Sequence, residues 1–200
     1  MASRRGLTGG TGDVNPQFLS WSVVQDGNDS TTTLAVNIPV QRLPTSGRAQ
    51  VMEVLSVKYD GSTIGGSSTA EVPRRYDASL DDHMELHFDE WSRSLTVRIA
   101  TRNPGTTAVG YNDPTVFSYY NKTKYGIYTA PGSYFIIEHE PYVDDLTDGA
   151  GHGYLVATDI IYIQISSQQT GSAQSCQGKL YYRWKNVGLQ EYIGIVQSQQ

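Results

Sequence analysis

Alternation of apolar and polar residues with a period of two is the feature that most constrains how this chain folds. Across residues 179–185, one face carries Leu180, Tyr182 and Trp184, and the other carries Lys179, Tyr181, Arg183 and Lys185. Successive side chains of a β-strand point to opposite sides of a sheet, so this pattern predicts a strand with one buried face. We expect it to run on to residue 196, as one strand bent near 187–188 or as two strands.

Similar patterns recur along the rest of the chain. They predict strands over 18–24, 33–40, 50–59, 83–89, 95–99, 134–139 and 154–166, with a hairpin turn near Ser92 and Arg93. No segment shows a period of 3.6 residues over three helical turns, so we expect an all-β protein. The stretches 61–80 and 103–132 are rich in turn-forming residues, and we expect them to be long loops at subunit contacts or on the exterior.

The length and composition of the chain predict a single domain. Its 200 residues suffice for one sizeable core. Residues 1–16 are polar and glycine-rich, which predicts a flexible N-terminal arm before a folded domain over 17–200. The single cysteine, Cys176, has no partner for an internal disulfide, and we interpret it as structural. No apolar run is long enough to cross a bilayer, so no membrane partner is expected.

The charge of the chain restricts its partners. A formal net charge of −5 argues against a domain dedicated to reading DNA or RNA, because such domains carry a basic excess. A small positive patch remains compatible with this charge. The best candidate is the outward face formed by Lys179, Arg183 and Lys185, although the net charge favours an ordinary solvated strand face.

Two groups of residues have the chemistry of metal ligands. One comprises His83, Glu85, His87 and Asp89, but same-face residues spread out along a strand, so solvent-facing side chains are the favoured interpretation. The other consists of the candidate calcium ligands Asp144, Asp145 and Asp148 near 138–140. Here we favour a solvated acidic loop, because no EF-hand spacing fixes the carboxylates around one point.

Motifs of catalysis are missing from the sequence. There is no nucleophile elbow, P-loop, zinc-protease motif or dinucleotide-binding fingerprint. We therefore expect neither enzyme activity nor a catalytic cofactor.

The end of the chain resembles a known family. The segments YLVATDIIYI (154–163) and LYYRWKNVGLQEYIGIV (180–196) are similar to the C-terminal strands of capsid proteins from small circular single-stranded DNA viruses. The order of the whole chain resembles that of a single jelly-roll capsid protein of a small icosahedral virus. It has an arm with Arg4 and Arg5, a series of strands, the Tyr-rich stretch 103–132 and two long final strands.

This resemblance implies a fold, a function and a set of partners. The fold is a single jelly-roll β-sandwich, with two antiparallel sheets, about eight strands and long loops. The function is self-assembly into an icosahedral shell that encloses the viral genome, expected to be single-stranded DNA. Arg4 and Arg5 are the expected nucleic-acid contacts, although the family's arm is usually much more basic. The protein would be part of the virion, would assemble inside the host cell, and would meet a host receptor or glycan.

Two other classes of function stay open on the sequence alone. A carbohydrate-binding β-sandwich module would use Trp21, Trp91 and Trp184 to stack on sugars, with calcium at 144–148. A metal-dependent β-barrel enzyme would use His83 and His87. We rank the shell protein first, the binding module second and the enzyme third.

Overall fold

The computed structural model describes residues 17–38, 42–43, 47–61, 90–130, 133–139, 143–170 and 172–199. The elements in chain order are β1 (Gln17–Val24), β2 (Thr31–Asn37), β3 (Arg42–Leu43), β4 (Arg48–Gly61), β5 (Glu90–Ala100), β6 (Val116–Ala130), β7 (Ser133–His139), β8 (Val143–Asp145), β9 (Tyr154–Val156), β10 (Ile160–Gln168), β11 (Ser175–Gly188) and α1 (Leu189–Ser198). The described residues are therefore mostly β-structure, as the alternation predicts.

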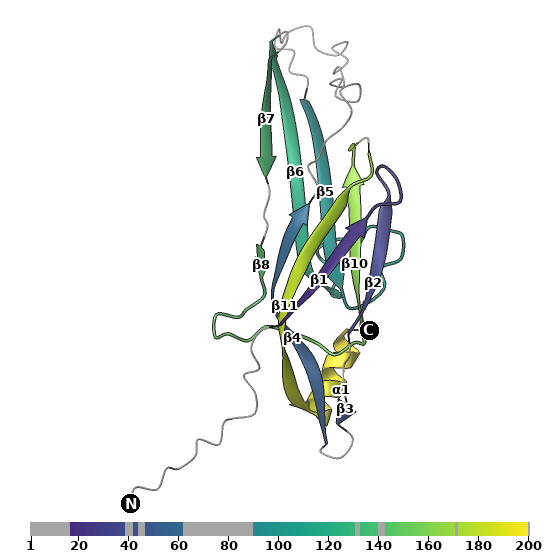
Figure 1. The fold of residues 1–200 in the computed structure, drawn as a ribbon, viewed down its shortest axis with the longest axis vertical. Helices are drawn as coiled ribbons and strands as arrows, with labels where there is room; N and C mark the ends of the chain where they lie inside the picture. The colour runs from purple at the N-terminus through teal and green to yellow at the C-terminus, as the bar shows by residue number, and fades with distance from the viewer. Residues whose placement is uncertain are drawn as a thin grey trace, which may run out of the picture.

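The strands form two antiparallel sheets that pack face to face (Figure 1). One sheet has the order β1-β11-β4-β3, with β8 and β9 also paired to β4, and the other has the order β2-β10-β5-β6-β7. The chain crosses from one sheet to the other after β1, β2, β4, β7, β9 and β10. This alternation between two antiparallel sheets is the jelly-roll arrangement, which confirms the predicted fold class.

The core lies between the two sheets. The six-stranded sheet contributes Trp21, Val23, Met52, Val54, Val57, Tyr59 and Leu180, and the five-stranded sheet contributes Leu95, Val97, Ile99, Phe117, Tyr120, Ile161, Ile163 and Ile165. Leu34, Val36, Tyr182 and Trp184 pack against this cluster. The core-facing residues of β2, β5, β10 and β11 are therefore those that the alternation predicts. Cys176 is also buried, and it is a free thiol.

A register shift in β4 separates its two core-facing runs. Tyr181 pairs with Ser56 and Tyr182 with Val54, so Leu55 is the extra residue of a β-bulge. The Leu55 carbonyl accepts a hydrogen bond from the amide of Leu146 at 2.9 Å. The bulge therefore helps to hold the start of the loop 146–153 beside the six-stranded sheet.

The prediction of strand structure to residue 196 is wrong. Strand β11 ends at Gly188, and residues 189–198 form α1, which lies at the lower end of the molecule (Figure 1). Tyr192, Ile195 and Val196 pack on Ala49, Val51, Ala157 and Val187 in a second, smaller apolar cluster. The spacing of three and four residues in this group is that of one helix face.

Three further boundaries also differ from the prediction. Residues 116–130, expected to be part of a long loop, form β6, so the connection after β5 is limited to 101–115. No turn occurs at Ser92 and Arg93, because β5 is continuous through both. The segment 154–166 is divided between β9 in one sheet and β10 in the other, since the chain changes sheets at 157–159. No helix within the described ranges is long and apolar enough to cross a membrane.

Candidate functional site

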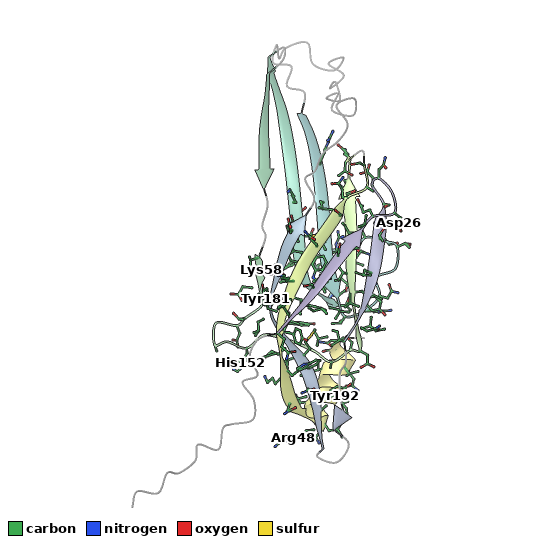
Figure 2. All side chains as sticks on the ribbon, in the orientation of Figure 1. Asp26, Arg48, Lys58, His152, Tyr181 and Tyr192 are labelled. Carbon is green, nitrogen blue, oxygen red and sulfur yellow. The ribbon has the colours of Figure 1, made fainter. Side chains whose placement is uncertain are left out.

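A group of lysines and aromatic rings lies on the face of the six-stranded sheet opposite to its core side. We call this group, formed by Phe18, Lys58, Lys179 and Tyr181, the lysine–aromatic surface. The Nζ of Lys58 lies 5.2 Å from the centre of the Tyr181 ring, and that of Lys179 lies 5.0 Å from the centre of the Phe18 ring. Figure 2 shows Lys58 and Tyr181 beside each other.

Strand pairing explains this arrangement. Because β11 lies between β1 and β4, Tyr181 is opposite Phe18, and Lys179 is opposite Lys58. Two like charges directly opposite each other destabilise a sheet, and a bound anion would relieve that repulsion. Phe18 is 58% exposed, although it is a large apolar residue. Cations beside exposed rings are the combination that holds phosphates and stacked bases of single-stranded nucleic acid.

The positive patch predicted at Lys179, Arg183 and Lys185 is divided by a buried carboxylate. Arg183 lies opposite Glu53 and donates a hydrogen bond from Nε to Glu53 Oε2, while Lys185 Nζ is 3.6 Å from Glu53 Oε1. These two cations are therefore partly neutralised. Lys179 is the member of the predicted patch that stays exposed beside another cation, and Lys58 is a site residue that the sequence analysis missed.

Glu53 anchors the loop 146–153 to the sheet. Its side chain is 1% exposed and accepts a hydrogen bond from the Gly153 amide at 3.1 Å. His152 Nδ1 lies 3.9 Å from the same carboxylate oxygen, and Arg183 Nη2 donates to the Gly151 carbonyl at 2.9 Å. Burial raises the pKa of Glu53, but hydrogen bonds from Arg183 and Gly153 and the charges of Lys185 and Arg183 outweigh it. The pKa of Glu53 is thus lowered, and the carboxylate is charged at neutral pH.

The three candidate calcium ligands point to different partners. Asp144 accepts hydrogen bonds from Ser118 Oγ at 2.7 Å and from the Tyr119 amide at 3.2 Å, which links β8 to β6 across the sandwich. Asp145 accepts from the amide and hydroxyl of Thr147. Asp148 accepts from the amides of Ala150 and His152. Within the part of the chain that the structure describes, no three His, Cys, Asp or Glu side chains gather around one point. Calcium binding stays a prediction.

Other predicted site residues lie in the core or outside the described residues. Trp21 is buried and the partly buried Trp184 packs against the core, which argues against the sugar stacking that the binding-module hypothesis expects of them. The side chain of Trp91 lies outside the described residues. Arg4 and Arg5 lie outside the described residues, as do His83, His87 and the rest of their predicted metal group.

Exposed apolar side chains occur on several separate sides of the sandwich. They are Phe18 and Val24 on β1, Val143 on β8, Tyr111 in the connection 101–115, and Leu189 and Ile193 on α1. Among the described strands, β1 has β11 as its one sheet neighbour and β2 has β10, so each has an open edge. Open strand edges and exposed apolar residues that lie next to each other, such as Leu189 and Ile193, are features that proteins cover by association.

Similarity to solved structures is limited to distant matches. The chain is similar to VP1 of Trichodysplasia spinulosa-associated polyomavirus in complex with GM1 oligosaccharide, with 12% identity over 89% of this chain and 96% of that one and a TM-score of 0.43. The Merkel cell polyomavirus virus-like particle gives 12% identity, 94% and 80% coverage and a TM-score of 0.46. New Jersey polyomavirus VP1 is 10% identical over 86% of this chain and 99% of that one, with a TM-score of 0.43. No protein-family model and no curated protein matches the sequence.

Proposed function

We propose that this protein is a structural viral capsid protein that self-assembles into a closed icosahedral shell and has no catalytic role. The observation that carries the proposal is a jelly roll with apolar residues exposed on several of its sides. Double-sheet jelly rolls are the domains of viral capsid proteins, and they also occur in lectins and cupins. Because a fold by itself does not fix a function, the surface features have the greater weight.

A closed shell requires each copy to contact neighbours through several different surfaces. The exposed residues supply such surfaces on the β1 edge, on the β8 edge and on α1. Leu189 and Ile193 are four residues apart on α1, so they form one exposed apolar strip that flanks the buried side of the helix carrying Tyr192. This strip is the contact that a single substitution tests most directly.

We also propose that basic residues of the shell contact the packaged genome. Arg4 and Arg5 would meet packaged nucleic acid, expected to be single-stranded DNA, from an arm over residues 1–16 that precedes the shell domain 17–200. The lysine–aromatic surface would add Lys58 and Lys179 from each copy. Affinity for nucleic acid grows with the number of phosphate contacts, and a shell multiplies these few charges by its number of copies.

The test of assembly is size-exclusion chromatography with negative-stain electron microscopy of the protein expressed alone. We expect uniform round particles from the wild type and none from Ile193→Asp. Gln190→Asp, which adds the same charge at an exposed position of α1, is expected to assemble. A monomer at all salt and calcium concentrations would refute the shell and favour the carbohydrate-binding module, which a glycan array would then examine.

The test of genome binding uses the same particles. The ratio of ultraviolet absorbance by nucleic acid to that by protein is expected to fall in Lys58→Gln with Lys179→Gln, and in a chain without residues 1–16. Digestion by a nuclease specific for DNA or for RNA identifies the nucleic acid. Particles that form normally with no nucleic acid inside would leave the shell standing and reject its genome contact.

The proposal extends to the location of the protein, to a receptor on the host and to structural calcium. As a capsid protein it would be part of the virion, would assemble inside the host cell, and would meet a host receptor or glycan on entry. Structural calcium at Asp144, Asp145 and Asp148 is tested by calorimetric titration of the assembled particles with calcium. Binding that disappears in Asp144→Asn would support the site, and no heat of binding would reject it.

A further inference from the structure

A polar groove of about 660 Å³ lies on the outer face of the five-stranded sheet. The residues that matter in it are Ser94, Thr96, Arg98, Tyr119, Asn121 and Ser166. They come from the three neighbouring strands β10, β5 and β6, with Ser166 opposite Thr96, Thr96 opposite Asn121, and Arg98 opposite Tyr119. Strand pairing thus places hydroxyls, an amide and one guanidinium in a continuous array.

Arg98 is the unusual member of this array. It is 8% exposed, its Nη1 donates a hydrogen bond to Ser166 Oγ at 2.8 Å, and its guanidinium lies 5.6 Å from the centre of the Tyr119 ring. Its Nε has no hydrogen-bond partner, and no carboxylate among the described residues pairs with it. Burial lowers the pKa of Arg98, which the Tyr119 hydroxyl opposes. A buried cation without a counter-ion is costly, and such groups gather at binding sites.

One wall of the groove is held in place before any ligand arrives. The side chain of Gln164 accepts a hydrogen bond from the Val109 amide at 3.2 Å and donates one to the Thr107 carbonyl at 3.0 Å. The hydroxyl of Thr33 donates to the Gly105 carbonyl at 2.8 Å. These bonds fix the connection 101–115 over the sheet and place Ala108 against the groove. A fixed wall reduces the entropy that binding costs.

The lining favours a small ligand with a single negative charge. Among the described residues that line the groove, Arg98 is the one cation, and its planar fork suits a carboxylate or a sulfate. Asp29 lies on the rim, where its carboxylate accepts hydrogen bonds from Thr170, and the chain carries a net charge of −5. Both disfavour a nucleotide or another polyanion. The surrounding hydroxyls and amide match a ligand that itself carries hydroxyl groups.

We propose that this groove binds an acidic saccharide, with its carboxylate or sulfate group on Arg98 and its hydroxyl groups on Thr96, Asn121 and Ser166. The site is distinct from the surfaces proposed for shell assembly, because its ligand-contacting residues lie on the outer face of the five-stranded sheet, whereas those surfaces lie on β1, β8 and α1. It is also distinct from the tryptophan stacking that the sequence suggests, since Trp21 and Trp184 belong to the core.

The test is isothermal titration of the protein with glucuronic acid, glucose 6-sulfate, glucose and adenosine monophosphate. We expect saturable binding of one or both acidic sugars, at least about tenfold weaker binding of glucose, and no stronger binding of the nucleotide. The two acidic sugars distinguish carboxylate from sulfate recognition. Absence of binding by both acidic sugars, equal binding of glucose, or tighter binding of adenosine monophosphate would overturn the proposal.

Two variants in the groove and one control outside it locate the site. Arg98→Gln is expected to lose at least about tenfold in affinity for the acidic sugar, because a charge-assisted hydrogen bond disappears. Arg48→Gln, which removes an exposed cation from β4 of the other sheet, is expected to bind within about twofold of the wild type. Thr96→Val keeps the side-chain shape without the hydroxyl, and a several-fold loss is expected even if Arg98→Gln does not fold. Unchanged affinity in Thr96→Val and in a folded Arg98→Gln would reject this location.

Discussion

Substitution of Glu53 by Gln tests the buried carboxylate that anchors the loop 146–153. Glutamine keeps an acceptor for the Gly153 amide but loses the charge-assisted hydrogen bond from Arg183, which is worth about 1.5–3 kcal/mol. Arg183 and Lys185 are 26% and 37% exposed, so both can turn toward water. The loss therefore stays below the roughly 3–5 kcal/mol of a fully buried broken pair. We expect about 2 kcal/mol.

The assay is urea denaturation of unassembled protein, followed by tryptophan fluorescence. A loss of about 2 kcal/mol lowers the urea midpoint, and in a parallel thermal melt it corresponds to a fall of roughly 4–8 °C in Tm for a domain of this size. Asp60→Asn is the matched control, because it neutralises an exposed acid on the same strand, and it is expected to change the free energy by less than about 0.5 kcal/mol. Equal midpoints for the two variants would contradict the anchoring role of Glu53.

Acidification supplies a second readout of the same substitution. Because the pKa of Glu53 is lower in the folded protein than in the unfolded chain, its contribution to stability is present at neutral pH. That contribution is lost as the pH falls through the lowered pKa, whereas glutamine does not titrate. The stability difference between wild type and Glu53→Gln should therefore shrink as the pH falls below the ordinary pKa of a glutamate, about 4.3. A difference that stays constant from neutral to acid pH would refute the electrostatic explanation.

Three further substitutions test the packing. Ile163→Ala, at a fully buried position of β10, should lower the free energy of unfolding by about 2–5 kcal/mol in urea titrations. Gly178→Ala would place a Cβ 2.4 Å from Trp21, so we expect a loss of about 1–3 kcal/mol and shifted tryptophan emission, whereas Gly188→Ala meets no atom within 4 Å and should fold normally. Tyr192→Ala should cost about 3 kcal/mol and reduce the helical circular dichroism signal, because Tyr192 is the buried anchor of α1. Unchanged signals would contradict each assignment in turn.

The strands that sequence reasoning finds are those whose core-facing positions are apolar throughout. Leu95, Val97 and Ile99 show this in β5. Strand β6 is not predicted from the sequence, because its core-facing side includes the polar residues Ser118 and Lys122, which interrupt the alternation of apolar and polar positions. The buried hydroxyl of Ser118 is nevertheless satisfied, since it forms hydrogen bonds with Tyr59 and Asp144. Helix α1 escapes because it is 10 residues long, which is less than three turns of pattern.

The candidate site could be predicted from the sequence in part. Lys179 is assigned to an outward strand face by local alternation alone. Its neighbour Lys58 is remote in the chain, so their pairing depends on the register between β4 and β11 and on the bulge at Leu55. The sequence around Arg98 does not predict a binding site either. That its buried guanidinium has an unpartnered Nε is seen only when the neighbouring strands are in place.

The position of β11 between β1 and β4 determines the order in which the domain can fold. Ser22 pairs with Gln177, so β1 can join the sheet only when β11, near the other end of the sequence, is available to pair with it. The entropy of closing so long a loop is lost before the contacts between β1 and β11 form. This predicts that the six-stranded sheet is completed slowly and late in folding. Phe18, Lys58 and Lys179 become neighbours at that moment. A partly folded chain therefore lacks the paired cations, and the proposed contact of Lys58 and Lys179 with nucleic acid would form only after the sheet is complete.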